Sequence, residues 1–271
     1  MNRILAAALA AMLFGSPFTL EASDKYETVA KLNDCVVLLH GLARTYRSMS
    51  DIESALVQAG YRVANIDYES REAPIQTLAL TAVSRGLGEC ASDGDGAIHF
   101  VTHSLGGILV RQFLTSRPIP RLGRVVMLAP PNQGSEVVDA WRTVPGFYWL
   151  NGPAGQQLGT DSDGIPRQLG PVTYPVGVIA GTRSINLILS LWLPNPDDGK
   201  VSVESTKVAG MSDFITVPVS HPFIANDTDV IRQVMQFLRS GKFDHGPKEK
   251  QLPRGSISTG ECAHTDDSER C

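Results

Sequence analysis

The stretch AIHFVTHSLGG, residues 97–107, places a serine directly after an apolar run and before two glycines. This arrangement is typical of the nucleophile elbow, a sharp strand-to-helix turn that lifts one hydroxyl out of the backbone. The usual pattern is G-x-S-x-G, and Thr102 stands in place of the first glycine. That position needs only a side chain small enough for strand and helix to pass. Ser104 is therefore the predicted nucleophile.

A serine hydroxyl needs a base to take its proton, and a carboxylate that fixes the tautomer of that base. In folds that carry this elbow, the chain order is serine, acid, histidine. Three of the six histidines precede Ser104, and two lie in the polar C-terminal tail. The remaining one, His221, follows the last predicted strand in VPVSHPFIAND. We expect His221 to be the base; the alternative is a loop histidine without a role.

The orienting acid has two candidates. The loop after the predicted strand at 176–180, GTRSINLILSLWLPNP, carries no acid, so Asp197 and Asp198 are the first available. Asp198 is preferred because the glycine that follows it lets the turn aim the side chain inward. Asp197 is the main rival. A third interpretation is that both aspartates only form a solvated Asx turn.

The oxyanion of an acyl-transfer intermediate needs backbone N–H donors. One is expected from Leu105, at the start of the helix that follows the nucleophile, where N–H groups are unpaired. The second is expected after the first strand, where Gly41 permits a bend that points the N–H of Leu42 into the site. His40 is interpreted as a buried brace for this loop.

Apolar runs of strand length alternate with helical patterns along most of the chain. The expected strands are 35–39, 62–66, 97–102, 124–128, 176–180 and 214–217. Helical patterns follow Ser50, Pro74, Ser104 and Asn226, and the first carries a predicted capping box of Ser50 with Glu53. This alternation predicts an α/β fold with a doubly wound, mostly parallel sheet.

The domain is expected to cover 23–240. Residues 131–175 are rich in Gly, Pro and Gln yet hold Trp141, Phe147 and Trp149, and they are interpreted as a lid or cap insertion over the strand ends. These aromatic residues and the run 185–193 are expected to line an acyl pocket or a lid; the alternative is that they belong to the core. Residues 241–271 lack apolar periodicity and are expected to form a flexible polar tail.

The first 22 residues have one basic residue, an apolar run and small polar residues, as a secretory signal peptide does; the alternative is a helix packed on the domain. We therefore expect a secreted or periplasmic protein. Four cysteines then permit two disulfides. Cys35 and Cys90 precede neighbouring strands and are expected to pair at the amino edge of the sheet; the alternative is two free thiols. Cys262 and Cys271 lie in the tail.

Two further classes are disfavoured. The formal charge of −4 and the absence of a Lys/Arg cluster argue against a nucleic-acid partner. No C-x-x-C pair is present, so zinc binding and thiol redox chemistry are not expected, and no cofactor is predicted. The oligomeric state and a calcium requirement are not indicated by the sequence.

The chain resembles bacterial lipases and esterases of the α/β-hydrolase superfamily. The resemblance rests on VVLLHGLARTYRSM, THSLGGILVRQFL, VVMLAPPNQGSEVVD and DDGKVSVEST followed by SHPF, and it spans most of 33–240 in the expected order. It implies the α/β-hydrolase fold, Ser104 as nucleophile, Asp198 and His221 as its partners, and Leu42 with Leu105 as oxyanion donors.

The expected activity is hydrolysis of carboxylic esters through an acyl-enzyme on Ser104. An acyltransferase, thioesterase or amidase with the same triad is the nearest alternative. A non-catalytic binding or folding factor on the same scaffold is a remote one. The expected partner is a small-molecule or lipid ester, with peripheral contact to a lipid interface.

Overall fold

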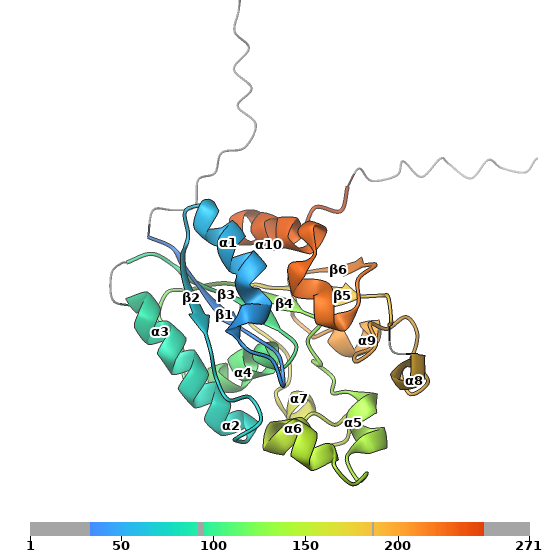
Figure 1. Cartoon of the computed structure of the whole chain (residues 1–271). Helices are drawn as coiled ribbons and strands as arrows, with labels where there is room; N and C mark the ends of the chain where they lie inside the picture. Colours follow the sequence, from blue (N-terminus) through green and yellow to red (C-terminus); the bar gives the residue numbers. More distant parts are fainter. Residues whose placement is uncertain (1–32, 92–94, 186, 247–271) are drawn as a thin grey trace, which may run out of the picture.

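The computed structural model describes residues 33–91, 95–185 and 187–246, and its centre is one sheet of parallel strands (Figure 1). The spatial order of the six strands is β2-β1-β3-β4-β5-β6. Their bounds are β1 Cys35–Leu39, β2 Arg62–Ile66, β3 Ile98–His103, β4 Leu122–Leu128, β5 Val176–Gly181 and β6 Asp213–Val217. The expected α/β class and parallel sheet are confirmed.

Burial of the strands follows their place in the sheet. Every residue of β1, β3 and β5 is buried, whereas the edge strands β2 and β6 are mostly half-buried. A central parallel strand is covered on both faces, and for this reason it reads as a continuous apolar run such as CVVLL. Alternate residues point to opposite faces: Val37 and Leu39 belong to one core, and Val36 and Leu38 to the other.

Helices cover both faces of the sheet (Figure 1). One core packs α2, α3 and α4 against the sheet, and the other packs α1 and α10. The bounds are α1 Ser50–Gln58, α2 Ile75–Leu78, α3 Ser84–Ala91, α4 Leu105–Leu114 and α10 Thr228–Ser240, with a π-helical turn at Ala79–Val83 between α2 and α3. The layers therefore hold the loops at the strand ends on a rigid base.

The connections at the carboxyl edge contain short helices. The segment between β4 and β5 forms α5 Glu136–Trp141, α6 Phe147–Gln156 and α7 Ile165–Gln168, and these lie together below the sheet in Figure 1. The segment between β5 and β6 forms α8 Leu187–Ser190 and α9 Val203–Thr206. Single 3₁₀ turns occupy Tyr46–Met49 and His221–Asn226. That 131–175 acts as a movable lid stays a prediction.

The predicted capping box at the start of α1 is wrong. Ser50 lies inside the helix, the N-cap is Met49, and no side chain caps it. The preceding 3₁₀ turn continues directly into α1, so Ser50 never takes the extended N-cap conformation. The Glu53 carboxylate instead accepts a hydrogen bond from Asn65 Nδ2 at 2.7 Å.

A disulfide joins Cys35 to Cys90, as predicted. Cys35 begins β1, whereas Cys90 lies in the last turn of α3 and not in the loop after it, where the sequence placed it. Both cysteines are buried at the amino edge of the sheet, opposite the loops that follow the strands. No described helix is long and apolar enough to cross a membrane.

The packed domain extends beyond the expected boundary at residue 240. Phe243 is buried against Phe237, with ring centroids 4.9 Å apart, and its backbone N–H donates to Asp213 Oδ2 at 2.8 Å. The predicted signal peptide, most of the predicted tail, and Cys262 and Cys271 lie outside the described residues.

The disulfide closes a loop of 55 residues. In the chain-entropy model such a cross-link stabilises the fold by about 4 kcal/mol, because it restricts the unfolded chain. We expect reductant to lower the free energy of unfolding by that order in a Cys262→Ala, Cys271→Ala variant, which retains only this pair of cysteines. Urea unfolding with and without reductant measures the difference. Equal unfolding midpoints would contradict it.

Candidate active site

Ser104 occupies the sharp turn between β3 and α4. Its backbone has φ 50° and ψ −118°, a conformation that a residue with a side chain rarely adopts and that costs on the order of 1–3 kcal/mol. The turn is fixed because the Ser104 N–H donates to the Leu128 carbonyl at 2.8 Å. A Cβ on Gly106 would lie 2.5 Å from the Leu39 carbonyl oxygen, so only glycine lets α4 approach β1 this closely.

His221 and Asp198 form a buried pair. His221 Nδ1 donates to Asp198 Oδ2 at 2.7 Å, and the His221 N–H donates to the Asp198 carbonyl at 3.0 Å. The other carboxylate oxygen of Asp198 accepts the backbone N–H groups of Lys200 at 3.0 Å and Val201 at 2.8 Å. Because Nδ1 carries the proton, Nε2 of a neutral His221 is left as a proton acceptor.

Asp197, the rival acid, is turned away from this pair toward α8. Its Oδ1 accepts hydrogen bonds from Ser190 Oγ at 2.7 Å and from the Gly199 N–H at 2.7 Å. Gly199 has φ 95°, and this left-handed conformation reverses the chain between the two aspartates and the residues that bind Asp198. The structure thus brings Asp198 and not Asp197 to the histidine.

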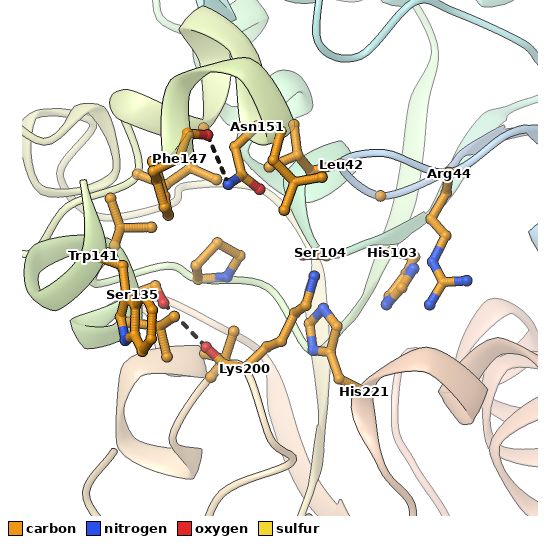
Figure 2. A pocket seen from close by; sticks show the side chains of 18 residues that line it. Leu42, Arg44, His103, Ser104, Ser135, Trp141, Phe147, Asn151, Lys200 and His221 are labelled. Carbon is orange, nitrogen blue, oxygen red and sulfur yellow. Dashed lines mark hydrogen bonds between the residues drawn. The ribbon is translucent and has the colours of Figure 1, made fainter. Parts of the chain in front are cut away.

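Ser104 and His221 line one cavity of about 250 Å³ (Figure 2). Its apolar walls come mainly from the 131–175 segment, with Val138, Trp141, Phe147, Leu150 and Leu158. Two of the three aromatic residues singled out in the sequence therefore line the cavity. Trp149 does not, since it is 83% exposed, and none of the residues of 185–193 whose side chains are described lines the cavity. The acyl-pocket interpretation is wrong for Trp149 and for those described residues.

The two predicted oxyanion donors flank the nucleophile. Leu105 is the first residue of α4, and Leu42 lines the cavity in the loop after β1. Neither N–H has a hydrogen-bond acceptor among the described residues. The adjacent amides do have partners: Ala43 N–H binds Ser70 Oγ at 2.9 Å, and Gly107 N–H binds the Ser104 carbonyl at 3.0 Å.

His40 braces the loop that presents Leu42. Its Nδ1 donates to the Gly41 carbonyl at 2.9 Å, its Nε2 accepts the Tyr68 N–H at 3.3 Å, and its ring stacks on Tyr68 with centroids 4.0 Å apart. One nitrogen donates and the other accepts, so this imidazole is neutral. Burial also lowers the pKa of His40, which favours the same neutral form. The structural interpretation of His40 agrees with this network.

Sequence reasoning missed three titratable residues of the cavity, namely Arg44, His103 and Lys200 (Figure 2). The His103 ring packs against His221, with centroids 4.9 Å apart, and neither of its nitrogens has a partner among the described residues. Burial, and then the charges of His221, Arg44 and Lys200, hold the pKa of His103 well below its usual value. Among the described residues, no cluster of His, Cys, Asp or Glu could hold a metal ion.

The comparison with family profiles matches residues 36–245, more than half of the chain, to the profile described as "Alpha/beta hydrolase family". The matched segment begins in β1 and ends after α10, so it contains Ser104, Asp198 and His221. The comparison with curated protein sequences gives no match.

Solved structures share the fold at low sequence identity. The Bacillus licheniformis lipase BlEst2 in mature form has a TM-score of 0.65 and 18% identity, over 79% of this chain and 96% of that one. Phospholipase PlaB from Legionella pneumophila has a TM-score of 0.62 and 15% identity, over 78% of this chain and 60% of that one. The metagenomic carboxyl esterase MGS0156 has a TM-score of 0.55 and 18% identity, over 72% of this chain and 67% of that one.

The strained turn at Ser104 has a measurable consequence for stability. Ser104→Gly and Ser104→Ala both remove the hydroxyl, but only glycine relieves the left-handed backbone, so we expect the glycine variant to be more stable by about 1 kcal/mol. Ser54 in α1 is the matched control, because glycine is there the less stable choice by roughly 0.5–1 kcal/mol. Urea unfolding of the four variants tests both signs. A glycine variant at 104 that is less stable than the alanine variant would mean that the turn is not strained.

Proposed function

The chain belongs to the alpha/beta hydrolase family, and on that premise we propose that it hydrolyses carboxylic esters through an acyl-enzyme on Ser104. The observation that carries the proposal is the Nδ1 to Oδ2 hydrogen bond of 2.7 Å between His221 and Asp198, at the wall of the cavity that holds Ser104. A buried carboxylate that fixes the tautomer of a histidine beside a serine is the arrangement that nucleophilic catalysis by serine requires.

In the proposed reaction, Ser104 Oγ attacks the ester carbonyl carbon while His221 Nε2 takes the hydroxyl proton. The carbonyl oxygen becomes an oxyanion that the N–H groups of Leu42 and Leu105 bind. The C–O bond to the alcohol then breaks, and His221 returns its proton to the leaving oxygen. Water, deprotonated by His221, attacks the acyl-enzyme; the Ser104 oxygen leaves and takes that proton back.

The cavity supports an ester with an apolar acyl group. Valine, leucine, tryptophan and phenylalanine side chains form most of its wall, and such walls bind hydrocarbon through burial of apolar surface. Two of the fold neighbours are a lipase and a carboxyl esterase, which agrees with this substrate class.

The nearest alternative keeps the same triad but changes the acceptor or the leaving group, as in an acyltransferase, a thioesterase or an amidase. Comparison of ester, thioester and amide substrates with the same acyl chain separates these activities. A non-catalytic binding factor is disfavoured, because it requires neither a strained serine nor an oriented histidine.

Export and contact with a lipid surface stay predictions. The Cys35–Cys90 disulfide supports an oxidising compartment. Tyr148 and Trp149 in α6 are 61% and 83% exposed, and the neighbouring Leu150 both lines the cavity and is 55% exposed. Apolar surface therefore continues from the cavity to the outside of the molecule, as peripheral contact with a lipid interface requires.

Replacement of the nucleophile tests the proposal directly. We expect Ser104→Ala to lower kcat for p-nitrophenyl butyrate by roughly 10⁴- to 10⁶-fold, because the acyl-enzyme cannot form. A fluorophosphonate probe should label the wild-type protein at Ser104 and leave the folded variant unlabelled. Ser135, which also lines the cavity, provides the matched control: Ser135→Ala should still be labelled. Near-normal turnover by folded Ser104→Ala would end the serine-hydrolase proposal.

The two adjacent aspartates allow a matched comparison. Asp198→Asn should lower kcat by roughly 10⁴-fold, because the amide favours the wrong tautomer of His221. Asp197→Asn removes a carboxylate one residue away that binds Ser190 and Gly199, and its effect on kcat should be far smaller. Steady-state kinetics with p-nitrophenyl butyrate compares the two variants. A larger loss in Asp197→Asn would transfer the acid role to Asp197.

A further inference from the structure

The wall of the cavity is positively charged. Arg44 and Lys200 are the only lining residues, among those described, that carry a full charge at neutral pH independently of the histidines, and no carboxylate lines it. Asp198, whose charge acts on Lys200, is 1% exposed, and its oxygens are already bound by His221 and two backbone N–H groups. Its one negative charge does not balance two cations.

The backbone of Lys200 is held from both sides. Its N–H donates to Asp198 Oδ1 at 3.0 Å, and its carbonyl accepts Ser135 Oγ at 3.0 Å. The ammonium forms no hydrogen bond or ion pair with any described residue, although Lys207 and Arg142 of the same domain have carboxylate partners. Figure 2 shows the Lys200 side chain reaching toward Ser104 beside the His221 ring.

Arg44 approaches the same place from the loop after β1. Ala43 has φ 55° and its N–H binds Ser70 Oγ, so the loop is fixed just before the arginine. In Figure 2 the guanidinium lies on the far side of the His103 ring from Lys200. It has no hydrogen-bond acceptor among the described residues. Arg44 and Lys200 thus flank the Ser104 and His221 side chains.

The two cations lie close enough to repel each other. After partial burial, the Arg44 charge is the next cause that lowers the pKa of the Lys200 ammonium, while Asp198 acts in the opposite direction. Lys200 nevertheless remains exposed. Two like charges without a counter-charge are unfavourable in the free protein, and an anion between them removes that repulsion.

An unsatisfied buried group lies between the two cations. His103 is 3% exposed, it lines the cavity, and neither ring nitrogen has a partner. A neutral imidazole can donate one hydrogen bond to an anionic oxygen, and burial without such a partner costs free energy. The polar end of the cavity therefore offers donors and positive charge, whereas its other end, at Trp141, Phe147 and Leu158, is apolar.

We propose that Arg44 and Lys200 form a subsite for an anionic group of the substrate, and that the preferred substrate is an ester with an apolar acyl chain and a carboxylate or phosphate near the scissile bond. This inference rests on the proposed ester hydrolysis. It adds to that proposal a negative charge on the substrate, a property that membership of the family does not determine. Guanidinium and ammonium groups bind both kinds of anion, so the experiment includes each.

The test compares two pairs of esters that differ in charge. One pair is 4-butyryloxybenzoate and its methyl ester, and the other is butyryl glycerol phosphate and monobutyrin. The readout is the ratio of kcat/KM for the anionic ester to that for its neutral partner. Intrinsic reactivity differs within a pair but is the same for every variant, so only the change in this ratio between variants is interpreted.

We expect Lys200→Met and Arg44→Gln each to lower the ratio by about tenfold or more, the effect of losing a hydrogen bond to a charged group. Arg47→Gln is the matched control, because Arg47 lies three residues from Arg44 and does not line the cavity; its ratio should not change. If Lys200 had a purely structural role, its replacement would lower kcat/KM equally for both esters of a pair. An unchanged ratio in Lys200→Met and Arg44→Gln overturns the inference. If the ratio falls for one of the two ester pairs and not for the other, that pair identifies the preferred anion as carboxylate or phosphate.

A binding measurement separates this inference from the proposed reaction. Calorimetry should show that hexyl phosphate binds the wild-type protein more tightly than hexanol, and that Lys200→Met and Arg44→Gln remove the difference. If no ester is hydrolysed but this binding pattern appears, the reaction is wrong and the anion subsite stands. If esters are hydrolysed with the same ratio in all variants and hexyl phosphate has no advantage, the reaction stands and the subsite is wrong.

Discussion

The left-handed turn at Ser104 is the constraint on which the rest of the site depends. A serine with φ 50° stays in that conformation only because its surroundings leave no alternative: its N–H is bound to the end of β4, and Gly106 lets α4 lie against the end of β1. The buried parallel strands β1, β3 and β4 thus fix Ser104, and the free energy of the core offsets the strain. The same turn places the first N–H groups of α4 beside the hydroxyl.

The Asp198 loop ties the remaining parts of the site to this turn. Its carboxylate binds the histidine that follows β6, its neighbouring Lys200 carbonyl binds Ser135 of the 131–175 segment, and Asp197 binds Ser190 of α8. Three connections at the carboxyl edge of the sheet therefore meet in one hydrogen-bonded loop. The Nδ1 bond to this loop fixes the orientation of the His221 ring.

Electrostatics divides the cavity into two ends. His40 and His103 are held neutral, mainly by burial, so they shape the loops without adding charge. Arg44 and Lys200 concentrate positive charge beside the nucleophile, where the aromatic and aliphatic wall lowers the local dielectric and strengthens their field. A positive field at this point would also favour an oxyanion, so the proposed substrate binding and the proposed reaction would draw on the same charges.

The strands, the sharp turn at Ser104 and the pairing of Cys35 with Cys90 were predictable from the sequence alone, because each depends on local residue types or on chain order in a parallel sheet. Chain order also singled out His221, and in the structure this histidine pairs with Asp198. The start of α1 was not determined, since a preceding 3₁₀ turn removed the N-cap role of Ser50. Local sequence narrowed the acid to Asp197 or Asp198, and the tertiary structure decided which one meets His221. It also decided that Arg44 and Lys200, 156 positions apart in the chain, face one cavity. Both lie in stretches that carry the family resemblance, but only the packing of the loops at the carboxyl edge brings them together.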